Sequence, residues 1–234
     1  PASLEPALTR EICDAAVRVA QAANYLSAGT VEFLVEPDGT YYFLEVNTRL
    51  QVEHTVTEVV TGIDIVREQF LIARGEPISF SQDQVAVRGY AIELRINAED
   101  PKNDFLASPG LVEVYRSSAG PGVRLDGTIY QGYVITPFYD SLIVKLTVYG
   151  FTWREAVDRM ARALNGFVII GVKSTIPYFQ QIVKEPDFIR MNLDTAYIDE
   201  HPQLLDYREQ EQEVVKLARL IAEINAYEKN PHTH

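Results

Sequence analysis

Apolar positions along the chain recur with the 3.6-residue period of an α-helix in several segments. Amphipathic helical segments cover residues 3–25 and 57–74, and Gly75 is expected to end the second. Shorter helices are predicted at residues 153–164, 176–183 and 186–190. A charged segment with an apolar stripe predicts one more helix over residues 205–227.

Short apolar runs between these helices predict β-strands. Residues 31–35 and 41–46 flank Glu36-Pro-Asp-Gly39, and a Pro-Asp-Gly turn between aromatic and β-branched runs is typical of a β-hairpin. Further strands are expected at residues 85–97, 111–115, 123–125, 141–149 and 167–172. We therefore expect an α+β fold. Its main internal boundary is predicted near residues 79–84, which separates residues 1–84 from residues 85–199. Residues 200–234 are predicted to form a helical extension.

Composition narrows the classes of protein to which this chain could belong. The 234 residues are 47% hydrophobic and carry a formal charge of -12, which argues against a nucleic-acid-binding protein. The single cysteine, Cys13, excludes an intrachain disulfide and a cysteine-based zinc site, and we expect it to be buried in a helix. Neither a bilayer-spanning run nor a signal peptide is visible, so a cytoplasmic location and no membrane partner are expected. Because the chain begins Pro-Ala-Ser directly before a helix, we expect it to be part of a longer protein.

The hairpin carries the most informative polar side chains. If Pro37-Asp38-Gly39 forms the turn, Glu32 lies nearly opposite Glu45 on the paired strand. Like charges on facing strands repel each other, and a divalent cation between the carboxylates would remove that repulsion. Asn47 points to the same face and adds an amide oxygen. Such an oxygen set suits a hard ion such as Mg²⁺ or Mn²⁺.

The polar alternation continues beyond Asn47. Arg49, Gln51 and Glu53 follow at every second position, and an extended chain would place them on the same surface as Glu45. A metal ion and an anion could then bind side by side, with the carboxylate of Glu53 beyond them as a base. This layout suits phosphoryl transfer to a small oxyanion. Taken singly, Glu32 and Glu45 could equally be ordinary solvent-facing residues of a half-exposed sheet.

Several long segments closely resemble biotin carboxylase, an ATP-grasp enzyme. The match is centred on Phe43-Leu-Glu-Val-Asn-Thr-Arg-Leu-Gln-Val-Glu-His54 and extends roughly from residue 30 to residue 199. It also includes Arg88-Gly-Tyr-Ala-Ile-Glu-Leu-Arg-Ile-Asn-Ala-Glu-Asp-Pro101, Pro137-Phe-Tyr-Asp-Ser141 and Gly171-Val-Lys-Ser-Thr175. The resemblance implies that residues 1–84 form the end of an ATP-grasp domain. It further implies that residues 85–199 form the biotin carboxylase C-terminal domain.

The resemblance also implies roles for individual residues. Glu32, Glu45 and Asn47 would hold the Mg²⁺ or Mn²⁺ ions that bridge the phosphates of ATP. Bicarbonate would be bound by Arg49, Gln51 and the backbone of Val52. Glu53 would deprotonate bicarbonate for attack on the γ-phosphate of ATP.

In the second half-reaction, which is also implied by the resemblance, carboxyphosphate would break down to CO₂ and phosphate, and the phosphate would take the N1 proton of biotin. Arg95 would stabilise the enolate-like ureido oxygen of biotin while N1 attacks CO₂. From the residues alone, Arg95 could equally be a structural arginine paired with Glu93 or Glu99. His54 falls at an even position, so we interpret it as structural.

The resemblance also implies partners for the chain, and it shows which nucleotide-binding features of the family are missing from this sequence. Biotin would arrive on a carboxyl carrier domain, a carboxyltransferase would complete the parent enzyme, and the chain would form a homodimer. The parent would be an acyl-CoA (acetyl-CoA or propionyl-CoA) or pyruvate carboxylase. The glycine-rich lid and the lysine and histidine residues with which an ATP-grasp enzyme holds nucleotide are missing from this sequence. We therefore expect the chain alone to be inactive.

Two alternatives remain open at this stage. A carbamoyl-phosphate-synthetase-like enzyme also phosphorylates bicarbonate, but Gln51-Val-Glu-His54 does not fit its strand. The second alternative is a non-catalytic dimerisation or assembly module, acting through the segment after Val85.

Overall fold

The computed structural model describes residues 4–207. The chain divides into two compact units, residues 1–88 and 89–234, and the fold is built from helices and sheets within each. The helix predicted at residues 205–227 lies outside the described residues except for positions 205–207. Within the described part, none of the helices is both long and apolar enough to span a membrane.

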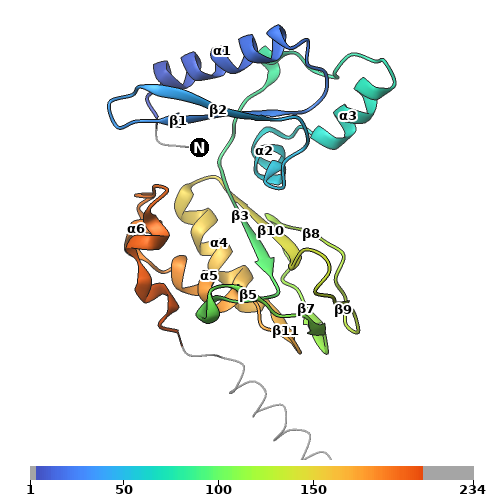
Figure 1. The fold of residues 1–234 in the computed structure, drawn as a ribbon, viewed down its shortest axis with the longest axis vertical. Coiled ribbons are helices and arrows are strands. Elements are labelled where there is room, and N and C mark those ends of the chain that lie inside the picture. Colours follow the sequence, from blue (N-terminus) through green and yellow to red (C-terminus); the bar gives the residue numbers. More distant parts are fainter. Residues whose placement is uncertain (1–3, 208–234) are drawn as a thin grey trace, which may run out of the picture. The chain divides into compact units, whose positions relative to one another are not determined.

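The first unit is a helix packed along a β-hairpin, followed by two short helices. Its elements are α1 (Pro6–Ala22), β1 (Thr30–Val35), β2 (Tyr41–Asn47), α2 (His54–Thr61), α3 (Ile65–Ala73) and the 3₁₀ turn η1 (Gln82–Gln84). Helix α1 runs alongside the hairpin (Figure 1), and the Tyr41 hydroxyl donates to Glu11 of α1 at 3.1 Å. The predicted helix and hairpin are confirmed. Cys13, however, is exposed, so its predicted burial is wrong.

The prediction of one continuous helix over residues 57–74 is also wrong. Gly62 ends α2 in the left-handed conformation, at a φ of 76°, and its N–H donates to the carbonyl of Glu58 at 2.8 Å. Asp64 then begins α3 as its N-cap by accepting from the N–H of Arg67 at 2.8 Å. The buried Glu58 carboxylate accepts from the N–H of Ile65 at 2.8 Å, which ties the two helices together.

A second buried carboxylate fixes the chain after α3. Glu68 is 6% exposed and accepts from both the N–H and the hydroxyl of Ser79, at 2.8 and 2.5 Å. These hydrogen bonds from Ser79 lower the pKa of Glu68 below its ordinary value of 4.5, because they favour the ionised form.

The second unit centres on a three-stranded antiparallel sheet in the order β3-β10-β8. These strands cover Tyr90–Asn97, Leu142–Gly150 and Val123–Gly127. Strand β3 begins five residues later than predicted, after η1 and an irregular segment. The other strands of this unit are β4 (Glu99–Asp100), β5 (Leu106–Ala107), β6 (Gly110–Leu111), β7 (Val114–Arg116), β9 (Val134–Ile135) and β11 (Val168–Ile170). The single strand predicted at residues 111–115 is thus divided between β6 and β7.

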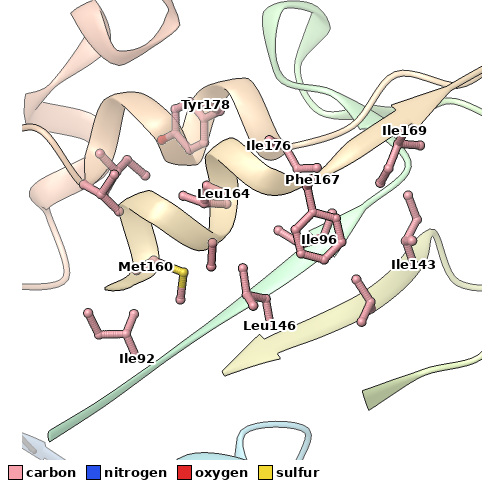
Figure 2. Packing of buried hydrophobic residues seen from close by; sticks show 14 of the residues in the cluster. Ile92, Ile96, Ile143, Leu146, Met160, Leu164, Phe167, Ile169, Ile176 and Tyr178 are labelled. Atoms are coloured by element: carbon pink, nitrogen blue, oxygen red, sulfur yellow. The ribbon is translucent and has the colours of Figure 1, made fainter. Parts of the chain in front are cut away.

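Helix α4 (Trp153–Gly166) packs against β3 and β10, and α5 (Ile176–Ile182) and α6 (Pro186–Ile189) pack against α4. The unit also contains α7 (Tyr197–Glu200) and the 3₁₀ turns η2 (Pro101–Asn103) and η3 (Pro202–Leu205). Figure 2 shows Met160 and Leu164 of α4 against Ile92, Ile96 and Leu146 of the strands, and these five side chains are almost or fully buried. This apolar core fixes the alternation of the strands, because a one-residue shift would turn the buried set toward solvent.

The Glu68–Ser79 contact predicts a pH-dependent stability in the first unit. A carboxyl whose pKa is lowered by folding stabilises the fold above about pH 4.5 and loses that contribution as the pH falls through its folded pKa. Glu68→Gln should therefore reduce the hydrogen-exchange protection of residues 65–79 at neutral pH. The difference from the wild type should shrink as the pH falls below 4.5 and through the lowered pKa of Glu68. Glu76→Gln, which alters an exposed pair with Arg74, is the matched control and should change little.

Candidate active site

A β-bulge in the hairpin determines which side chains face each other. From the turn, β1 and β2 pair regularly as far as Phe33 opposite Phe43, and the register then shifts so that Glu32 lies opposite Glu45. Leu44 is the extra residue. In an unshifted register Glu32 would face Leu44, and Glu45 would project from the other face of the hairpin. The bulge therefore brings both carboxylates to one face, as predicted.

The opposite face of the hairpin is apolar. Phe33 forms edge-to-face contacts with Tyr41 and Phe43, at centroid distances of 5.7 and 6.2 Å. Since Phe33 follows Glu32 directly in β1, these rings lie on the other side of the sheet from the carboxylates. Aromatic packing and the contact of Tyr41 with α1 thus orient the hairpin and leave the acidic face free of α1.

Asn47 joins the two facing carboxylates. Its Nδ2 donates to Glu32 Oε1 at 2.8 Å and to Glu45 Oε1 at 2.9 Å. Both acceptor oxygens therefore lie within hydrogen-bonding distance of a single nitrogen atom. Asn47 is paired with Thr30 across the strands, two positions beyond the Glu32–Glu45 pair, so the amide lies on the acidic face.

The side chains of Arg49 and Gln51 join this cluster, although not by the predicted route. Strand β2 ends at Asn47, so the predicted extended alternation up to Glu53 is wrong. A turn instead carries the following residues back toward the hairpin. Gln51 Nε2 donates to Glu32 Oε1 at 2.9 Å, and an NH2 group of Arg49 donates to Asn47 Oδ1 at 3.3 Å. Arg49 also donates to the carbonyl of Leu50 at 3.2 Å.

The turn leads directly into α2. Val52 lies in the turn, and Glu53 occupies the N-cap position of α2 with an exposed side chain that does not cap the helix. His54 Nδ1 lies 2.6 Å from the carbonyl oxygen of Gln51, which holds the turn closed. This contact agrees with the interpretation of His54 as a structural residue.

Arg95 belongs to the second unit. It is an exposed residue of β3, on the polar face of the sheet, and it lies opposite Lys145 of β10. Asp126 of β8 lies opposite Lys145 on its other side. The sequence motif includes Arg95, but the register adds two charged neighbours that no motif predicted.

Thr175 is a positioning residue that the sequence patterns did not single out. It is 3% exposed, and its hydroxyl accepts from the N–H of Asn97 at 3.0 Å and donates to the carbonyl of Arg95 at 3.4 Å. The Thr175 N–H also donates to the carbonyl of Asn97 at 3.1 Å. Its presence in the segment Gly171-Val-Lys-Ser-Thr175 was the available signal, but its role depends on a contact across 80 residues.

The donor set on the hairpin fits a hard divalent cation. Glu32 Oε1 and Glu45 Oε1 both lie within hydrogen-bonding distance of the Asn47 amide nitrogen, and carboxylate and amide oxygens are the ligands that suit Mg²⁺ or Mn²⁺. Among residues 4–207, no group of three or more His, Cys, Asp or Glu side chains is arranged to hold a metal ion. A cation on this face would therefore need further oxygens from water or from a bound phosphate.

Two families match successive parts of the chain. Residues 1–81 match the family described as the carbamoyl-phosphate synthase L chain, ATP binding domain. Residues 93–200 match the biotin carboxylase C-terminal domain. Residues 93–200 thus carry the biotin carboxylase C-terminal domain, and the chain as a whole is similar to biotin carboxylases. Relatives that extend over both segments are named as carboxylases, which favours this family over the carbamoyl-phosphate-synthetase-like alternative.

Two curated relatives illustrate the match. One of the pyruvate carboxylase subunits of Methanothermobacter thermautotrophicus is 48% identical over 203 residues, which are 87% of this chain and 41% of the relative. The biotin carboxylase of a Nostoc species is 48% identical over 198 residues, covering 85% of this chain and 44% of the relative. The chain thus spans less than half the length of these relatives.

Solved structures agree with the curated relatives. The biotin carboxylase domain dimer of the 2-oxoglutarate carboxylase of Hydrogenobacter thermophilus, in complex with MgADP, ADP and bicarbonate, matches with a TM-score of 0.85. It is 47% identical, and the match covers 88% of this chain and 46% of that one. The biotin carboxylase subunit of a pyruvate carboxylase also matches with a TM-score of 0.85, at 46% identity.

The facing carboxylates predict a gain in stability when one charge is removed. Glu45→Gln keeps an acceptor for Asn47 but relieves a like-charge pair on facing strands, a contact that destabilises the hairpin. The variant should therefore be more stable than the wild type, as measured by hydrogen exchange of the hairpin. Glu36→Gln removes an exposed charge at the turn and serves as the control. A less stable Glu45→Gln variant would contradict this account.

Proposed function

We propose that this chain forms the carboxy-terminal part of a biotin carboxylase, a ligase that uses ATP and bicarbonate to carboxylate N1 of biotin. The observation that carries the proposal is the convergence of Glu32, Glu45, Asn47, Arg49 and Gln51 into one hydrogen-bonded cluster on the hairpin. Its support from relatives is a similar domain described in complex with MgADP and bicarbonate.

In this proposal Glu32, Glu45 and Asn47 would hold Mg²⁺ or Mn²⁺, and the cation would supply positive charge to neutralise the phosphates of ATP. The geometry supports this role because both carboxylates and the amide lie on one face, opposite the apolar contacts of Phe33. The hairpin is held by α1, which gives these ligands a fixed relative position.

Bicarbonate lies beside the cation in this proposal. The guanidinium of Arg49, the amide of Gln51 and the backbone N–H of Val52 donate to its oxygens. Glu53, at the start of α2, takes the proton of bicarbonate, which then attacks the γ-phosphate of ATP to form carboxyphosphate and ADP. The short turn from Asn47 to Glu53 supports this arrangement, because it returns Arg49 and Gln51 to the carboxylates.

Biotin is carboxylated in the second step. Carboxyphosphate breaks down to CO₂ and phosphate, phosphate accepts the N1 proton of biotin, and N1 attacks CO₂. Arg95 provides a permanent cation for the ureido oxygen as negative charge develops there. Its exposure on β3, with a backbone fixed by Thr175, supports a role toward a bound molecule rather than toward the core.

A complete site also needs a nucleotide-binding lobe. The acidic face of the hairpin carries Leu34 and Tyr42, each 55% exposed, and such an apolar surface fits coverage by further protein. The proposal includes a biotin carboxyl carrier domain, a carboxyltransferase component and a second copy of the enzyme as partners. An acyl-CoA or pyruvate carboxylase is the proposed parent, and a cytoplasmic location remains a prediction of the sequence.

Substitution of the base tests this function in the intact carboxylase that carries residues 1–234. Glu53→Gln should reduce bicarbonate-dependent ATP hydrolysis by about 10²-fold or more, because the base is lost while the size of the side chain is kept. Arg49→Lys should chiefly raise the KM for bicarbonate, since an ammonium cannot reproduce the guanidinium fork. Glu36→Gln is the control, and sedimentation should report an unchanged dimer. Unchanged turnover in both variants would leave only the assembly role.

The isolated chain gives a further prediction. Purified residues 1–234 should not carboxylate free biotin at a measurable fraction of the rate of an intact biotin carboxylase, because the nucleotide lobe is missing. Incorporation of labelled bicarbonate into biotin measures this directly. A rate comparable to that of an intact enzyme would refute the proposed division of the active site.

A further inference from the structure

We propose that Asn47 is a positioning residue that couples the divalent cation to bicarbonate: when its amide oxygen ligates the cation, it releases the guanidinium of Arg49 to bind the anion. This inference rests on the proposed function. It starts from the observation that both residues assigned to bicarbonate donate hydrogen bonds to the proposed metal ligands, Arg49 to Asn47 and Gln51 to Glu32.

The orientation of the Asn47 amide follows from the chemistry of its neighbours. Carboxylates only accept hydrogen bonds and a guanidinium only donates them. The NH₂ end of Asn47 must therefore face Glu32 and Glu45, at 2.8 and 2.9 Å, and its oxygen must face Arg49, at 3.3 Å. The opposite orientation would lose all three contacts.

Cation binding is incompatible with this set of hydrogen bonds. An N–H group cannot ligate a cation, and the carboxylate oxygens that accept from Nδ2 are the atoms a cation requires. To ligate through Oδ1, the Asn47 amide must turn by about half a revolution about its terminal torsion, which is a soft, two-fold rotation. The same rotation presents NH₂, a donor, to the guanidinium of Arg49. Arg49 then loses its acceptor on Asn47.

Cation binding also weakens the hydrogen bond that Gln51 donates to Glu32. A single oxygen, Glu32 Oε1, accepts from both Asn47 Nδ2 and Gln51 Nε2. Once that oxygen ligates a cation, the positive charge opposes the N–H dipole of Gln51. The donors of Arg49 and Gln51 are thereby freed together. They lie on the turn that also carries Val52 and Glu53, the proposed base.

Two sites coupled in this way must obey reciprocity. If the cation raises the affinity for bicarbonate, bicarbonate raises the affinity for the cation by the same factor, and couplings of this kind are typically about 5–150-fold. Direct Coulomb attraction between a cation and an anion would also give positive coupling. The two explanations differ in their dependence on Asn47.

The variant Asn47→Asp distinguishes an exchange of hydrogen bonds at Asn47 from direct Coulomb attraction between the cation and bicarbonate. Aspartate keeps an oxygen ligand, but its two oxygens can face the cation and Arg49 at once, so cation binding no longer requires the release of Arg49. If the cation acts by releasing Arg49, the coupling between cation binding and bicarbonate binding should therefore be smaller in Asn47→Asp. Coulomb attraction between cation and bicarbonate is unchanged by one more fixed charge nearby, and it predicts the same coupling as in the wild type.

The experiment uses the intact carboxylase that carries residues 1–234 and measures the dissociation constant of Mn²⁺ by electron paramagnetic resonance, with and without saturating bicarbonate. Chloride at equal ionic strength replaces bicarbonate in the reference sample. We expect bicarbonate to tighten Mn²⁺ binding by about tenfold in the wild type and by less than about threefold in Asn47→Asp. Thr40→Asp, which adds one charge at the hairpin turn, should keep the wild-type coupling.

The remaining outcomes separate this inference from the proposed function. Equal coupling in Asn47→Asp and the wild type would overturn the inference in favour of simple electrostatics. Mn²⁺ binding that depends on Glu45 but shows no coupling in the wild type would also overturn it and would leave the proposed metal site intact. Mn²⁺ affinity that is the same in Glu45→Gln and the wild type would instead refute the proposed metal site.

Discussion

The β-bulge at Leu44 determines which face of the hairpin each acidic side chain occupies. One extra residue in β2 shifts the register by a single position, and this shift places Glu45 opposite Glu32 and Asn47 opposite Thr30. The turn after Asn47 then has two acceptors of the hairpin within its reach, Asn47 Oδ1 for Arg49 and Glu32 Oε1 for Gln51. Bulges commonly re-aim side chains near functional sites, and here the whole polar cluster depends on one.

This arrangement leaves an electrostatic repulsion in the folded protein. Two carboxylates face each other across paired strands, an arrangement that stability alone disfavours. Asn47 and Gln51 offset the repulsion by donating three hydrogen bonds to them. Retention of an unfavourable charge pair is common where function requires it, and a cation bound between the carboxylates would convert the conflict into an interaction that favours binding.

Sequence patterns predicted the elements better than the contacts between them. The Pro-Asp-Gly turn placed Glu32 only near Glu45, and the bulge that sets the two residues opposite each other was not predicted, because no local residue preference marks Leu44 as an extra position. Helical periodicity continues through Gly62, so it concealed the break between α2 and α3. The alternation from Glu45 to Glu53 correctly grouped Arg49 and Gln51 with Glu32, although a turn rather than a strand brings them there. Thr175 acts over a long sequence separation, which local patterns do not report.

The central claim is that Glu32, Glu45 and Asn47 share one divalent cation. A crystal structure of the intact carboxylase with Mn²⁺, phased to reveal anomalous scattering, tests it most directly. We predict an anomalous peak in contact with both carboxylates and with Asn47 Oδ1, and an Arg49 guanidinium that no longer donates to that oxygen. A peak elsewhere, with the Asn47 amide still donating to both carboxylates, would contradict the account.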